Sequence, residues 1–232
     1  MFDFNKLKKN IDEIQNKINY FFKNKDLLIE AFIHKSYLNE NKDIKIKDNE
    51  RLEFLGDSVL SLIISDFLFN KLPSSDEGKL SHIRSLIVNA TQCEIYFEKL
   101  NLNDYILLSK GEIKAKRKSS ISANALEALI GAIYVDSGYE KTKLFLLNHF
   151  EDMFLDILKN PKMDNKSTLQ EYAQKKYNTI PEYKLINAEG PEHEKIFFVQ
   201  VYVNNEPLGK GSGSCKKTAE QNAANDALSN LK

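Results

Sequence analysis

The sequence predicts an all-α N-terminal domain over 1–158, a linker over 159–166 and a small α+β domain of order α-β-β-β-α over 167–232. Apolar residues recur at helical spacing through the first part, whereas three strand-like runs lie between two helix-like segments in the second. Between the two parts, the stretch NPKMDNKS is polar, contains Pro161 and has no periodicity, which is typical of a linker. With 232 residues, 42% of them hydrophobic, the chain is long enough to bury such cores.

The first half of the N-terminal domain should contain three helices. Residues 2–22 alternate apolar and charged residues at helical spacing, and Asp26 can cap a second helix through LLIEAFIHKSYL. A polar, Lys-rich loop should follow over 39–48. The third helix contains NERLEFLGDSVLSLIISDF (49–67) and should end before Pro73, because proline does not continue a helix.

The second half of this domain is also expected to be helical. Ser74, Ser75 and Glu77 form a capping arrangement for the segment GKLSHIRSLIVNATQCEIYFEKL. Residues 109–120 predict a basic, glycine-containing loop, which either contacts phosphates or is simply solvated. An apolar helix through SANALEALIGAIYVDSG should stop at Gly138, and a last helix should span about 141–158.

The C-terminal domain should begin with a short helix through TLQEYAQKK. Strands are predicted at Glu182–Ala188, Lys195–Val203 and Pro207–Ser212, and the middle one is rich in β-branched and aromatic residues. The segment KKTAEQNAANDALSNL, with alanine at close-packing positions, predicts the closing helix.

Composition limits the function classes. Lys+Arg and Asp+Glu are 33 each, so net charge neither favours nor excludes a nucleic-acid partner. Cys93 and Cys215 lie far apart and predict no disulfide framework, which fits a reducing cytosol. The N-terminus does not resemble a signal peptide, and no window approaches the run of about 18 apolar residues that spans a bilayer. We expect a cytoplasmic protein with no membrane partner.

Carboxylates interrupt two otherwise apolar helices. Glu50, Glu53 and Asp57 fall within about 60° of one another around the first helix, and Asn124 and Glu127 share a face of the second. Such pairs are ordinary on solvated helix faces. Here the flanking residues are apolar, and buried carboxylates require a cation. A Mg²⁺ ion held between the two helices would satisfy this all-oxygen set.

Two glycines lie in the same helices. Gly56 and Gly131 either allow the two backbones to approach closely at this site or simply ease helix packing.

The residues also carry a family resemblance. ERLEFLGDSVL (50–60) closely resembles the signature of bacterial ribonuclease III, and His34-Lys35-Ser36, Glu77-Gly78-Lys79-Leu80 and ANALEALIGAIYVDSG resemble further segments of that family. The C-terminal part resembles a double-stranded-RNA-binding domain, so the resemblance covers essentially the whole chain. It implies a homodimeric, Mg²⁺-dependent endonuclease, with Mn²⁺ able to substitute. It also implies cleavage of double-stranded RNA to 5′-phosphate and 3′-hydroxyl ends, in ribosomal RNA precursors and structured messenger RNAs.

The resemblance also implies residue roles. Asp57 and Glu127 would be the catalytic carboxylates, and the metal ligands would be Glu53, Asp57, Asn124 and Glu127. Glu50 and Glu77 would line the cleavage valley. The residues that would contact RNA in the C-terminal domain are Thr168, Gln170, Glu171, His193, Lys216 and Lys217. His34 is expected to be a hydrogen-bonded structural histidine.

The departure from the family pattern that matters most is Asn124, where the family normally has Asp. An amide oxygen can ligate Mg²⁺ but brings no charge, so metal affinity should fall. The rival hypothesis is therefore a non-catalytic or weakly active double-stranded-RNA-binding protein. A helical scaffold that pairs its acidic stripes with a partner protein is a third hypothesis, but it leaves the C-terminal domain unexplained.

Overall fold

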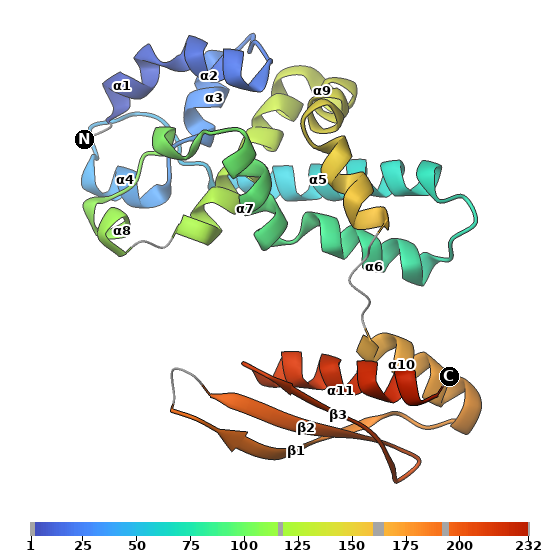
Figure 1. Cartoon of the computed structure of the whole chain (residues 1–232). Coiled ribbons are helices and arrows are strands. Elements are labelled where there is room, and N and C mark those ends of the chain that lie inside the picture. The colour runs from blue at the N-terminus through green and yellow to red at the C-terminus, as the bar shows by residue number, and fades with distance from the viewer. Residues whose placement is uncertain (1–2, 116–117, 160–164, 192–194, 232) are drawn as a thin grey trace. The chain divides into compact units, whose positions relative to one another are not determined.

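The chain forms two compact units, Met1–Pro161 and Lys162–Lys232. The computed structural model describes residues 3–115, 118–159, 165–191 and 195–231. The first unit is helical, and the second has the order α-β-β-β-α (Figure 1). The predicted fold class is thereby confirmed.

Helices α5 (Glu50–Lys71) and α9 (Lys118–Lys159) form the centre of the N-terminal unit, where they pack along each other and α7 (Ala90–Lys99) packs on α9. The core includes an aromatic cluster in which the ring of Tyr96 lies 4.9 Å from that of Phe150 and 5.6 Å from that of Phe154. The elements of this unit are α1 (Phe4–Lys9), α2 (Ile11–Ile18), α3 (Lys25–Ala31), α4 (Lys35–Glu40), α5 (Glu50–Lys71), α6 (Glu77–Val88), α7 (Ala90–Lys99), the 3-10 turn η1 (Asn103–Tyr105), α8 (Lys110–Ala115) and α9 (Lys118–Lys159).

Two segments that we predicted as single helices are each divided at an asparagine. Asn10 separates α1 from α2, and its side chain donates to the Lys6 carbonyl at 2.9 Å. Asn89 separates α6 from α7; its amide donates to Leu86 O at 2.8 Å and its Oδ1 accepts from Gln92 N at 3.0 Å. Asparagine side chains compete for backbone groups in this way, so they end helices that apolar spacing alone would continue.

Two predicted caps are replaced by neighbouring residues. Asn24, rather than Asp26, begins α3, because Asn24 Oδ1 accepts from Asp26 N at 3.1 Å. Asp76, rather than Ser74–Ser75, begins α6, and its Oδ1 accepts from Lys79 N at 2.8 Å. Both are common N-cap residue types.

The segment predicted as one helix through residues 27–38 is broken between α3 and α4. Ile33 there forms a parallel bridge with Leu107, and Asn49 N donates to Ile33 O at 2.9 Å. These long-range bonds, which the local pattern does not reveal, hold the start of α4 next to the start of α5.

The later boundaries follow the prediction in part. The predicted loop over 109–120 instead contains α8 and the first residues of α9. The predicted stop at Gly138 is confirmed, since α9 has a non-helical kink there, with φ 78° and ψ −173°. Glycine adopts this conformation without steric cost. Within the predicted linker, Lys159 still belongs to α9 and Asn165–Lys166 begin α10, while 160–164 lie outside the described residues.

In the C-terminal unit, α11 (Lys216–Asn230) packs on one antiparallel sheet of order β1-β2-β3, and α10 (Asn165–Tyr177) packs against α11. Tyr183 of β1 lies opposite Val201 of β2, which lies opposite Gly209 of β3. The elements are α10 (Asn165–Tyr177), β1 (Glu182–Glu189), β2 (Ile196–Val203), β3 (Glu206–Gly213) and α11 (Lys216–Asn230).

Helix α11 meets β3 through residues with almost no side chain. A Cβ atom on Gly211 would lie 2.1 Å from Ala223 N, and one on Gly209 would lie 2.4 Å from Ala227 N. Both alanines are fully buried. We call this contact the glycine–alanine seam.

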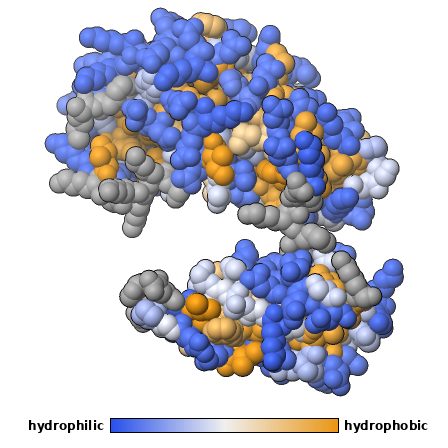
Figure 2. All heavy atoms as spheres, viewed as in Figure 1, coloured by the Kyte–Doolittle hydropathy of each residue, from blue (hydrophilic) through white to orange (hydrophobic). Residues whose placement is uncertain are grey.

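The visible surface of both units is largely hydrophilic, with smaller apolar patches (Figure 2). Among the helices of the described residues, none combines the length and the apolar character that crossing a membrane requires.

Candidate active site

Helices α5 and α9 approach each other with their backbones in contact at two glycines. A Cβ atom on Gly56 would lie 1.7 Å from the carbonyl oxygen of Glu127, and one on Gly131 would lie 2.2 Å from that of Leu52. Any other residue at either position would push the helices apart. The two glycines therefore do more than ease packing: they set the distance between the helices that carry the predicted carboxylates.

This crossing brings all four predicted metal-ligating residues together. The side chain of Asn124 lies close enough to the carboxylate of Glu53 to lower its pKa, which links α9 to α5. Burial, followed by the negative charges of Asp57 and Glu53, raises the pKa of Glu127 to about 7. Burial and the charge of Glu50 likewise raise the pKa of Glu53. The four side chains thus form one electrostatically coupled cluster, which we call the carboxylate cluster.

The carboxylate cluster lies at the rim of the helix crossing. Glu53, Asn124 and Glu127 are half-buried, and Asp57 is exposed. The apolar residues that flank these carboxylates in the sequence predicted that the carboxylates would be buried. This prediction is wrong for Asp57, whose side chain is exposed. The adjacent Leu52 and Leu60 point into the core, while the polar stripe of α5 faces outward. A substrate can therefore reach the cluster from solvent.

The donor chemistry of the cluster fits Mg²⁺. All four side chains offer oxygen atoms, and none of the ion pairs found among the described residues includes Glu53, Asp57 or Glu127. Mg²⁺ is usually held by one or two carboxylates and keeps several waters, which leaves room for a phosphate. In the described part of the chain, however, no three His, Cys, Asp or Glu side chains already converge on one point. The carboxylates would have to rotate to share an ion.

The raised pKa of Glu127 predicts how pH affects stability without metal. The pKa is about 7 in the folded chain, against an ordinary glutamate value of 4.5, so the folded state binds the Glu127 proton more tightly than the unfolded state. With a chelator present, the free energy of unfolding should therefore fall as pH rises from about 5 to about 8. Urea denaturation at several pH values measures this change.

The Glu127→Gln form should lose most of this pH dependence, because glutamine does not titrate. Glu140, an exposed residue on the same helix, provides the matched control Glu140→Gln. An equal fall in stability for the original chain and the Glu127→Gln form would contradict the assignment.

The two predicted cleavage-valley residues behave differently. Glu50 lies close enough to Glu53 for its charge to raise the pKa of that carboxyl. Glu77 is exposed at the start of α6, where its carboxylate accepts from Ser81 Oγ at 2.9 Å. The structure thus brings Glu50 to the carboxylate cluster and records no interaction between the cluster and Glu77 among the described residues.

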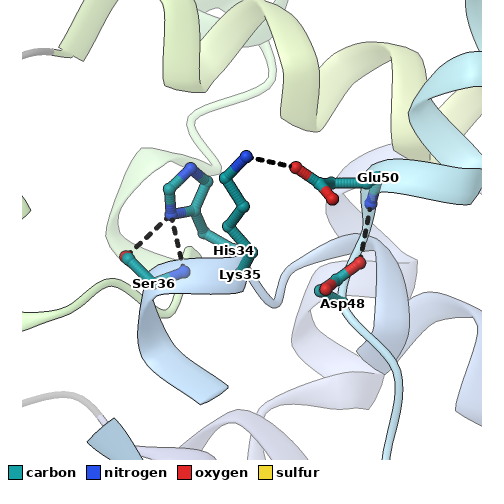
Figure 3. A network of polar contacts seen from close by, with 5 residues as sticks. All are labelled: His34, Lys35, Ser36, Asp48 and Glu50. Carbon is teal, nitrogen blue, oxygen red and sulfur yellow. Dashed lines mark hydrogen bonds and ion pairs between the residues drawn. The ribbon is translucent and has the colours of Figure 1, made fainter. Parts of the chain in front are cut away.

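Sequence reasoning did not select two residues beside the cluster. Lys35 Nζ donates to Glu50 Oε1 at 2.5 Å (Figure 3). Cys93 is fully buried, and burial followed by the charges of Glu127 and Asp57 raises the pKa of its thiol to about 12. Cys93 is therefore an inert packing residue. The family resemblance of the segment His34-Lys35-Ser36 was the only feature of the sequence that could have drawn attention to Lys35.

The predicted RNA-contacting residues of the C-terminal unit lie on α10 and α11. Lys216 and Lys217 are exposed at the first turn of α11, where the positive end of the helix dipole favours anions. Gln170 and Glu171 are exposed on α10 and line a shallow hollow there, whereas Thr168 is half-buried. His193 lies outside the described residues.

Family models match both units. A model described as Ribonuclease-III-like matches residues 24–153, and a model described as Double-stranded RNA binding motif matches residues 165–231. The first contains the carboxylate cluster, and the second contains both predicted RNA-contacting helices.

Similar proteins cover nearly the whole chain. Ribonuclease 3 of Protochlamydia amoebophila is 45% identical over 220 residues, which are 94% of this chain and 90% of that protein. Ribonuclease 3 of Borreliella burgdorferi is 44% identical over 228 residues, which are 97% and 92%. A solved nuclease domain of Ribonuclease III from Campylobacter jejuni, described as flexible in a region involved in dimer formation, matches with a TM-score of 0.56. It is 42% identical and covers 62% of this chain and 97% of that one.

Proposed function

This chain belongs to the ribonuclease III family and is a double-stranded-RNA-specific endoribonuclease, and we propose that it cuts with Mg²⁺ bound at the carboxylate cluster. Mn²⁺ would substitute. The observation that supports the metal site most directly is the crossing at Gly56 and Gly131, which gathers three carboxylates, none of which forms an ion pair among the described residues. We further propose 5′-phosphate and 3′-hydroxyl products, ribosomal RNA precursors and structured messenger RNAs as substrates, and a cytoplasmic location.

The chemistry proposed is metal-assisted hydrolysis of a phosphodiester bond. Bound Mg²⁺ would lower the pKa of a water molecule and neutralise charge on the phosphate. Glu53 and Glu127 would ligate the ion, and the Asn124 side chain, which acts on the carboxylate of Glu53, would orient that carboxylate. Asp57, the most exposed member of the cluster, would face the substrate. The raised pKa of Glu127 means that metal must displace a proton near neutral pH.

We also propose that two copies associate through α5. The large apolar side chains of Phe54, Leu62 and Phe69 are 79%, 55% and 70% exposed. At 100° per residue they fall within about 80° of one another, so they form one stripe on the outer face of the helix. An exposed apolar stripe of this kind is typical of an interaction surface. The description of the Campylobacter jejuni nuclease domain, which refers to dimer formation, supports this proposal.

A Mg²⁺ titration of duplex RNA cleavage tests the metal site through Asn124. Asn124→Asp replaces a neutral amide next to Glu53 with a fourth charged ligand candidate, so half-maximal cleavage should need about tenfold less Mg²⁺. Asn70 supplies the matched control, because its amide donates to the carboxylate of Asp66 at 3.1 Å on the same helix as Glu53. Asn70→Asp should leave the Mg²⁺ requirement unchanged.

The outcomes separate the enzyme from its rival. If the original chain cuts and Asn124→Asp cuts at lower Mg²⁺, Asn124 tunes a working nuclease. If the original chain binds duplex RNA but does not cut at any Mg²⁺ concentration, while Asn124→Asp does, the chain is an RNA-binding protein on a disabled nuclease frame. If neither form cuts, the account of the site is wrong.

A further inference from the structure

Lys35 is the cation beside the carboxylate cluster. Its ammonium contacts Glu50, and its positive charge also acts on Glu53, where it lowers the pKa. The side chains of Lys35 and Glu50 are 58% and 51% exposed. The pair therefore lies at the surface, at the N-terminal end of α5 (Figure 3). We call the three carboxylates that follow one face of this helix, Glu50, Glu53 and Asp57, the acidic stripe.

The backbone around Lys35 is held firmly. His34 N donates to Leu107 O at 3.1 Å, and Ser36 N donates to His34 Nδ1 at 3.3 Å. Since a backbone N–H can only donate, Nδ1 is the unprotonated ring nitrogen and accepts from Ser36 Oγ as well, at 2.7 Å. Ser36 Oγ in turn accepts from Ser109 N at 3.1 Å. These bonds fix the position from which the Lys35 side chain extends.

Folding stability gives little reason for the ion pair itself. Exposed pairs of Lys and Glu gain little, because water and salt screen their charges and because both side chains lose freedom. The neighbourhood of the pair supplies a stronger reason. Duplex RNA is polyanionic, and the acidic stripe repels it, so a phosphate that approaches the cluster needs a cation within reach. Lys35 supplies that cation from a fixed backbone. Because its ion pair with Glu50 is exposed to solvent, the ammonium can leave Glu50 for a phosphate oxygen at little cost.

We propose that Lys35 is a further RNA-binding residue of the N-terminal unit, whose ammonium leaves Glu50 for a phosphate oxygen when duplex RNA reaches the carboxylate cluster. The exchange releases the carboxylate of Glu50 at the moment the substrate arrives. This inference rests on the proposed function, because it requires duplex RNA to be cut at the carboxylate cluster.

The test is single-turnover cleavage of duplex RNA by the full chain, with Mg²⁺ present, over a range of salt concentrations. Lys35→Gln should raise the half-saturating enzyme concentration about fivefold and reduce its log–log salt slope by about one, as expected for one lost phosphate contact. The maximal rate should stay within about twofold. Lys35→Arg keeps the charge and should restore both the half-saturating concentration and the slope.

Two comparisons isolate the contact. Lys25 forms a similar exposed pair with Asp12 at 2.8 Å, between α2 and α3, so Lys25→Gln should leave the salt slope unchanged. In chains that already carry Glu50→Gln, Lys35→Gln should still reduce the slope. Thermal unfolding identifies any variant that fails to fold. If Lys35→Gln fails to fold, the salt slope of Lys35→Arg is compared with that of the original chain instead.

Each result decides the inference. An unchanged salt slope for Lys35→Gln would overturn it, and so would an effect that disappears in the Glu50→Gln chain, because Lys35 would then act only by restraining Glu50. If either of these results is found while the original chain cuts duplex RNA normally, only the inference about Lys35 fails and the proposed function stands. A chain that neither binds nor cuts duplex RNA would overturn the endonuclease proposal and this inference together.

Discussion

Replacing Glu127 with Gln is expected to abolish duplex RNA cleavage while leaving duplex binding intact. Glu127 is the carboxylate on which burial and the charges of Asp57 and Glu53 converge, so it gains most from a bound cation. Glutamine keeps the size of the side chain but removes its charge. Outer partners of metal ligands cost up to about 100-fold when mutated, so a direct ligand should cost more than about 100-fold in the cleavage rate.

Single-turnover cleavage at saturating enzyme measures the loss of cleavage rate, and filter binding of the same duplex measures the affinity for RNA. Binding should survive because Lys216 and Lys217 lie in the other compact unit. Glu140→Gln on α9 is the matched control and should cut normally. A Glu127→Gln chain that cuts within about threefold of the original would remove Glu127 from the catalytic machinery.

Replacing Gly56 with Ala is expected to destabilise the N-terminal unit by about 3 kcal/mol or more, at the upper end of the range for overpacked cores. The added Cβ would lie 1.7 Å from Glu127 O and 2.9 Å from Gly131 N, which are backbone atoms without rotamers to adjust. The helices must separate, and the carboxylate cluster must separate with them. Urea denaturation measures the free energy of unfolding, and cleavage should fall even where the chain remains folded.

Gly78→Ala is the control with the opposite expected sign. Gly78 lies in α6, where an added Cβ would lie 3.6 Å from Asp76 Oδ1, an ordinary contact. Alanine favours a helix by about 0.5–1 kcal/mol over glycine, so this variant should be slightly more stable. Equal stability for the Gly56→Ala and original chains would mean that α5 and α9 do not touch through their backbones.

The sequence predicted the elements better than their ends. Periodicity indicates which residues face the core, so α5, α9 and the strands were predictable from the local pattern. The divisions at Asn10 and Asn89 depend on single side chains that take backbone hydrogen bonds, and an apolar pattern does not register them. The break before α4 depends on Leu107, which is distant in the sequence.

The candidate site divides in the same way. Helical spacing is sufficient to place Glu53 with Asp57, and Asn124 with Glu127. Two features required the tertiary structure: the exposure of Asp57, which depends on where the helix crossing ends, and the pairing of Lys35 with Glu50, which depends on the break before α4.

The glycine–alanine seam has a consequence for conformational entropy. Glycine and alanine have no side-chain rotamers, so packing Gly209 and Gly211 against Ala223 and Ala227 loses no side-chain entropy on folding. A small domain with few apolar residues can thus hold a helix against its sheet at no cost in side-chain entropy, while the two glycines still lose backbone entropy on folding. The seam also has no rotamers to fluctuate among, so the first turn of α11 is presented to a ligand in one arrangement, already ordered before binding.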